Sequence, residues 1–233
     1  MVDMIIAAQK PLEEIKSIVT KHKKILLLGC GTCVTVCMAG GEKEVGILAS
    51  ALRMARRLAG NEIEIIEATI LRQCEWEYLE EITQKVDEVE AVLSMACGVG
   101  VQAMAQQFPD KLIYPALNTT SLGMPVQPGL WVENCRGCGN CGLARFGAVC
   151  PIARCSKNLL NGPCGGSQNG KCEVNPETDC GWQLIYERLE RLGQLELLED
   201  ILPPKDWSTD RDNGPRRTIR EDVFIADVKG GKA

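Results

Sequence analysis

The chain has 233 residues, a net charge of −5 and 45% hydrophobic residues, few of them aromatic. This length suits one medium domain or two small ones with a mostly aliphatic core. The acidic balance argues against nucleic-acid binding, which favours basic proteins. No apolar run approaches the roughly 18–20 residues of a membrane span, and residues 1–10 lack the pattern of a secretion signal. We therefore expect a cytoplasmic protein.

Residues 1–117 alternate between helical and strand patterns. The apolar periodicity predicts helices at 11–22, 40–60, 75–89 and 101–108. It predicts buried strands at 24–29, 62–69, 91–98 and 111–117. Strands that alternate with helices of this length form parallel sheets with right-handed crossovers. We therefore expect an α/β fold, with a small doubly wound parallel sheet of the flavodoxin-like or Rossmann-like type.

The rest of the chain has a different composition. Residues 118–181 are rich in glycine, proline, asparagine and cysteine and show no apolar period. Such a loop-rich segment cannot build an ordinary core, and bound metal is the most plausible support for it. A helix is predicted at 182–202, and the tail at 203–233 is expected to be disordered or laid on a partner.

Thirteen cysteines and a single histidine, His22, stand out in the composition. In a reducing cytoplasm so many thiols are better explained as metal ligands than as disulfides. With one histidine, any metal is held mainly by thiolate sulfur, which selects zinc or iron–sulfur clusters.

The first cysteine group lies in "GCGTCVTVC", where Cys30, Cys33 and Cys37 follow the first strand of the predicted sheet. Cys97 stands in the same way at the end of the third strand. In a flavodoxin-like order these two strands are neighbours, so all four thiols can meet at one edge of the sheet. Four thiols are the full ligand set of one [4Fe–4S] cluster.

Three other interpretations of this group stay open. The thiols can be small core residues. The loop can bind a dinucleotide, although the last glycine of G-x-G-x-x-G is missing. Cys30 and Cys33 can form a redox disulfide or a regulatory redox sensor, which leaves Cys37 and Cys97 unexplained.

The second group begins with "NCRGCGNCG", whose C-x2-C-x2-C spacing opens a bacterial ferredoxin motif. Eight cysteines supply two four-ligand sites, and iron–sulfur is favoured over zinc, with zinc possible at one site. How these eight pair stays open. They are Cys135, Cys138, Cys141, Cys150, Cys155, Cys164, Cys172 and Cys180.

Cys74 is left over, just after the second strand among acidic residues, and we treat it as a non-ligand. The twelve remaining cysteines match three cubane clusters, so two to three [4Fe–4S] clusters are expected. A single histidine provides no Ser/His/Asp or Cys/His arrangement, and there is no Walker loop. A protein dense in clusters without a substrate site is best interpreted as an electron conduit to a partner that carries a flavin.

Four stretches together resemble a known family: "KKILLLGCGTCVTVCMAGGEKEV", "SMACGVGVQ", "NCRGCGNCG…CPIARCSKNLLNGPCGG" and "PPKDWS". They are similar to the small iron–sulfur subunit (MetV) of bacterial and archaeal methylenetetrahydrofolate reductases. The "NGPCGG" block resembles the methylenetetrahydrofolate reductase C-terminal domain.

The resemblance implies an electron-transfer subunit with its cysteines as cluster ligands and no catalytic residue of its own. It implies a flavin-bearing barrel partner (MetF-like), which would hold the flavin and folate sites and reduce methylene- to methyl-tetrahydrofolate in the methyl branch of the acetyl-CoA pathway. A ferredoxin or further donor subunits would supply the electrons. The alternative is a zinc-stapled docking subunit of the same kind of complex that carries no electrons.

Overall fold

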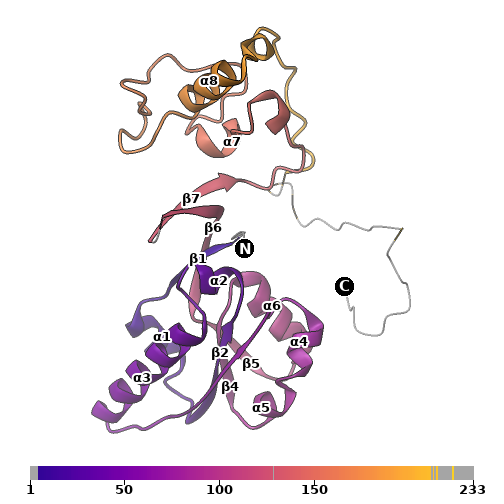
Figure 1. Cartoon of the computed structure of the whole chain (residues 1–233). Coiled ribbons are helices and arrows are strands. Elements are labelled where there is room, and N and C mark those ends of the chain that lie inside the picture. Colours follow the sequence, from indigo (N-terminus) through magenta and orange to yellow (C-terminus); the bar gives the residue numbers. More distant parts are fainter. Residues whose placement is uncertain (1–4, 128, 211, 213, 215–221, 223–233) are drawn as a thin grey trace. The chain divides into compact units, whose positions relative to one another are not determined.

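The computed structural model describes residues 5–127, 129–210, 212, 214 and 222 (Figure 1). The chain divides into two compact units, Met1–Arg136 and Gly137–Ala233. The sequence pattern predicts an α/β region that ends at residue 117, whereas the first unit continues for nineteen residues more. The reason is a second, antiparallel sheet that the sequence pattern did not reveal.

A four-stranded parallel sheet forms the centre of the first unit, as predicted. Its strand order is β3-β2-β4-β5, which is the flavodoxin-like order expected from the alternating pattern. The strands are β2 (Lys24–Cys30), β3 (Glu64–Ile70), β4 (Ala91–Met95) and β5 (Leu112–Pro115). The helices are α1 (Leu12–Ile18), α2 (Cys33–Val36), α3 (Glu42–Leu58), α4 (Trp76–Glu80), α5 (Thr83–Asp87) and α6 (Gly98–Gln107).

Helices cover both faces of this sheet, because the central strand is apolar on both sides. Ile25 and Leu27 of β2 belong to the apolar cluster that contains residues of α1 and α3. Leu26 and Leu28 belong to the opposite cluster, with residues of α4, α5 and α6. All four side chains are fully buried. This burial on both faces explains why "ILLL", residues 25–28, is a continuous hydrophobic run.

The helix predicted at 75–89 is two short helices, α4 and α5. Ile82 lies between them with φ −107° and ψ 4°, outside the helical region. The break lets Leu79, Ile82 and Val86 all pack into the same buried cluster.

The antiparallel sheet contains β1 (Ile6–Gln9), β6 (Leu117–Gln127) and β7 (Leu130–Cys135), in the order β1-β6-β7. These strands were not predicted. Strand β6 contains Gly123 and Pro125, which are unusual inside a strand, and its register shifts beside both. A Cβ on Gly123 would lie 2.2 Å from the carbonyl oxygen of Val132, so the close approach of β7 requires glycine there.

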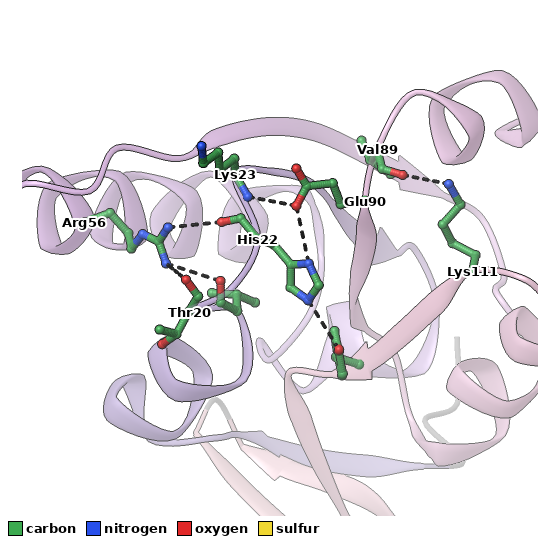
Figure 2. A network of polar contacts seen from close by, with 9 residues as sticks. Thr20, His22, Lys23, Arg56, Val89, Glu90 and Lys111 are labelled. Atoms are coloured by element: carbon green, nitrogen blue, oxygen red, sulfur yellow. Dashed lines mark hydrogen bonds and ion pairs between the residues drawn. The ribbon is translucent and has the colours of Figure 1, made fainter.

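Polar side chains cluster at the amino edge of the parallel sheet (Figure 2). The buried Arg56 of α3 donates hydrogen bonds to the carbonyl oxygens of Thr20 and His22, which follow α1. His22 lies 3.5 Å from the Glu90 carboxylate and 3.3 Å from the Tyr114 hydroxyl. The only histidine therefore joins elements at one edge of the sheet, while the first cysteine group lies at the opposite edge.

The described residues of the second unit have little regular structure. Its elements are η1 (Leu143–Arg145), α7 (Pro151–Arg154), α8 (Gly181–Leu192) and η2 (Leu195–Leu198). Phe146 and Trp182 meet edge to face, with ring centroids 5.8 Å apart. With Ile185 and Leu189 they form the centre of a small core.

The helix predicted at 182–202 ends earlier, at Leu192. Gly193 follows in the left-handed conformation, with φ 65°, and terminates α8. Most of the predicted tail at 203–233 lies outside the described residues, and residues 203–207 have no regular structure. None of the helices in the described part of the chain is long and apolar enough to cross a membrane.

Candidate metal-binding cysteine sites

The carboxyl edge of the parallel sheet carries the first cysteine group. Cys30 is the last residue of β2, and Cys97 follows β4 by two residues. The two strands pair in parallel, with Gly29 opposite Met95. The predicted adjacency of these strands is therefore confirmed, and both thiols are buried at the same edge.

The loop that carries Cys33 and Cys37 folds tightly back over this edge. The N–H of Cys30 donates to the carbonyl oxygen of Gly40 (3.0 Å), and the Thr35 hydroxyl donates to the carbonyl oxygen of Cys30 (2.7 Å). A Cβ on Gly40 would lie 2.0 Å from the carbonyl oxygen of Met95, so only glycine fits at that crossing. Glycine at position 40 therefore serves close backbone packing.

Cys33 and Cys37 lie in different surroundings. Cys33 is half-buried at the start of α2. The Sγ atom of Cys37 is buried and lies 3.6 Å from the carbonyl oxygens of Ala7 in β1 and Val34 in α2. The Cys37 thiol therefore contacts the antiparallel sheet.

Cys74, which the sequence analysis treats as a non-ligand, lies in the loop after β3. Cys74 is an exposed residue, but partial burial of its thiol raises the pKa, and the neighbouring thiols of Cys30 and Cys97 raise the pKa further. The structure thus places a third thiol from a third strand near the other two. No local pattern in the sequence marks it, but its position just after a strand could have suggested it.

The unit boundary falls within the C-x2-C-x2-C motif. Cys135 is the last residue of β7 in the first unit, while Cys138 and Cys141 begin the second. In the second unit, the Thr209 hydroxyl donates to the carbonyl oxygen of Cys138 (2.9 Å). The Lys205 ammonium donates to the carbonyl oxygen of Asn140 (2.7 Å). The first part of the predicted tail therefore holds this cysteine loop.

Four other cysteines line one small pocket in the second unit. Lys157, Glu173 and Trp182 also line it. The four cysteines are Cys155, Cys164, Cys172 and Cys180. They come from more than twenty residues of loop, and Cys138, Cys141 and Cys150 are not among the lining residues.

Short main-chain contacts assemble this pocket. Cys155 ends α7 and Cys180 caps α8. A Cβ on Gly181 would lie 2.6 Å from the carbonyl oxygen of Arg154, so glycine lets the two helix ends meet. The N–H of Cys180 donates to the carbonyl oxygen of Gly170 (2.8 Å), which holds the loop around Gly170 beside the start of α8.

The thiols of this pocket are soft donors, which select zinc or iron–sulfur clusters. A hydrogen bond with the Ser156 hydroxyl lowers the pKa of the half-buried Cys172 thiol. A lower pKa favours the thiolate, which is the form that binds metal. As they stand, no three or more histidine, cysteine, aspartate or glutamate side chains of the described residues form a group that could hold a metal ion.

Comparison with known families relates the cysteine-rich part of the chain to one class of protein. Residues 114–208 match the family model described as "Methylene-tetrahydrofolate reductase C terminal". The match covers fewer than half of the residues of the chain, and it includes β6, β7 and all eight cysteines of the second group. It supports a relationship to methylenetetrahydrofolate reductases. No curated protein and no solved structure gives a significant match.

Proposed function

We propose that this chain is the iron–sulfur electron-transfer subunit of a methylenetetrahydrofolate reductase complex. The observation that supports this most strongly is the pocket lined by four cysteines, within the region that matches the reductase family. Four thiols are the ligand set of a [4Fe–4S] cluster. Clusters transfer single electrons, which suits delivery to a flavin on a partner subunit.

The chain's own residues would hold two to three such clusters. Cys155, Cys164, Cys172 and Cys180 are the ligands of one, because they line a single pocket. Cysteines at the carboxyl edge of the parallel sheet are the ligands of another. Folate and flavin would bind to the MetF-like partner, and this chain would contribute no catalytic residue.

Anaerobic purification tests the proposal directly. The full chain should be brown, absorb near 400 nm and contain about eight to twelve irons on the count of four per cluster. Reduced protein should give the EPR signals of [4Fe–4S]⁺ clusters. A colourless chain with stoichiometric zinc and no iron would refute the proposal.

The role in the complex needs a second measurement. With a MetF-like flavin subunit added, the rate of flavin reduction by a low-potential donor such as ferredoxin should depend on this chain. We expect a Cys164→Ala variant to bind the partner normally but to reduce its flavin more slowly. Cys164 suits this test because it is exposed, so its loss leaves no cavity in a core.

A zinc-stapled docking subunit is the second candidate. Four cysteines around one pocket are also the ligand set of a structural zinc site. Replacing Cys30 and Cys97 together separates the two functions. A complex that stays intact but loses electron entry supports electron transfer, whereas a complex that dissociates supports docking.

A further inference from the structure

Each of three neighbouring strands of the first unit has a cysteine at its end or within four residues after it. In the order β3-β2-β4, Cys30 is the last residue of β2, Cys97 follows β4 and Cys74 follows β3. Because the strands are parallel, with Cys30 paired with Ile70, all three chain segments leave the sheet at the same edge. This edge is where doubly wound sheets bind their ligands.

The loop that carries Cys74 is held against this edge by its own main chain. The N–H of Gly31 donates to the carbonyl oxygen of Ile70 (2.9 Å). The Sγ atom of Cys30 lies 3.8 Å from the carbonyl oxygen of Leu71. The backbone after β3 therefore passes directly beside the Cys30 thiol.

Gln73 anchors the same loop from within the core. Its side chain is fully buried, and its amide group donates to the carbonyl oxygen of Leu28 in β2 (2.9 Å). Its carbonyl oxygen accepts a hydrogen bond from the Ser94 hydroxyl of β4 (2.6 Å). One residue before Cys74, the loop is thus tied to both strands that carry the other two cysteines.

These backbone contacts bring the segment that carries Cys74 to the strand ends that carry Cys30 and Cys97. The Sγ atom of Cys37, by contrast, is buried and lies 3.6 Å from the carbonyl oxygens of Ala7 in β1 and Val34 in α2. The ligand set expected from the sequence includes Cys37 and omits Cys74, although the fold ties the segment next to Cys74 to β2 and β4.

We propose that Cys74 is a thiolate ligand of the cluster at this edge, together with Cys30, Cys33 and Cys97, and that Cys37 is a core residue. Three strand ends and the first residue of α2 then supply one thiol each. Each thiol loses its proton when it binds iron. This inference rests on the proposed function, because it assigns the ligands of one of the proposed clusters.

Paired alanine variants of the full chain test the assignment. Cys74→Ala changes the cysteine that the inference adds to the ligand set, and Cys37→Ala makes the same substitution at the cysteine that the inference removes from it. Cys97→Ala is the positive control. Each variant is reconstituted anaerobically with iron and sulfide, and its iron content and EPR spectrum are measured. We expect Cys74→Ala and Cys97→Ala to lose about four irons and one EPR component each, and Cys37→Ala to match the wild type.

Far-UV circular dichroism distinguishes loss of a ligand from loss of the fold. Cys74 is exposed, so its alanine variant should fold, and Cys74→Ser is a second variant that removes less volume. An unchanged iron content in both Cys74 variants overturns the inference, as does a Cys37→Ala variant that loses the cluster. Iron that depends on Cys97 but not on Cys74 refutes only this assignment, whereas a wild-type chain without iron refutes the proposed function.

Discussion

Replacing Arg56 by methionine should lower the free energy of unfolding of the first unit by about 3–5 kcal/mol. The Arg56 side chain is 5% exposed. It donates four hydrogen bonds to carbonyl oxygens, from Nε to Asn61 (2.8 Å), from Nη1 to Val19 (3.2 Å) and Thr20 (2.8 Å), and from Nη2 to His22 (3.0 Å). These groups follow the ends of α1 and α3, so one guanidinium donates to several carbonyls at helix ends, of which that of Val19 also accepts the N–H of His22 (3.1 Å).

The magnitude follows from the number and type of these bonds. A hydrogen bond from a charged donor contributes about 1.5–3 kcal/mol, so four bonds at the lower end contribute about 6 kcal/mol. Methionine recovers part of this because its flexible side chain fills the space and carries no charge to desolvate. Water recovers another part by reaching the outer carbonyl oxygens, which leaves a net loss of about 3–5 kcal/mol.

Hydrogen exchange measured by mass spectrometry suits this test, because peptides from β2 and α3 report the opening of the first unit alone. Arg57→Met is the matched control, since Arg57 is the next residue in the same helix and is exposed. It should change the opening free energy by less than about 0.5 kcal/mol. Equal protection in the two variants would show that the four hydrogen bonds do not stabilise the fold as argued.

Three further predictions concern the sites. Gly40→Ala places a Cβ 2.0 Å from a main-chain oxygen of β4 and should lower the thermal midpoint of unfolding by several degrees. Gly46 lies within α3, and a Cβ there would have its nearest neighbour 3.8 Å away, so Gly46→Ala should raise the free energy of unfolding by about 0.5–1 kcal/mol. Gln73→Leu leaves two buried polar groups without their partner, so urea unfolding should show a loss of about 2–3 kcal/mol, and an unchanged midpoint would contradict the role of this side chain as an anchor. In the metal-free chain, Ser156→Ala removes the hydrogen bond that lowers the pKa of Cys172, so half-maximal alkylation of this thiol should move to higher pH; a profile that stays in place would refute that cause.

Local sequence pattern was sufficient for the parallel sheet. Buried strands such as β2 are apolar on both faces and alternate with amphipathic helices such as α3, and this alternation restricts the topology to very few arrangements. The adjacency of Cys30 and Cys97 follows from that topology alone. Pattern was insufficient for β6, where Gly123 and Pro125 interrupt the alternation and the strand is specified by its pairing with β1 and β7.

The grouping of the cysteines was decided by tertiary structure. The second group contains eight cysteines, but their loops have no apolar period from which the position of a side chain could be inferred. Only close backbone contacts, such as that of Gly181 with Arg154, bring four of these cysteines to one pocket. For Cys74, the decisive contacts are those of Gln73 with two strands that are distant in the sequence. The sequence by itself thus determined the parallel sheet and the supply of thiols. Long-range packing decided which of these thiols lie together, because the positions of loop residues depend on contacts that spacing does not encode.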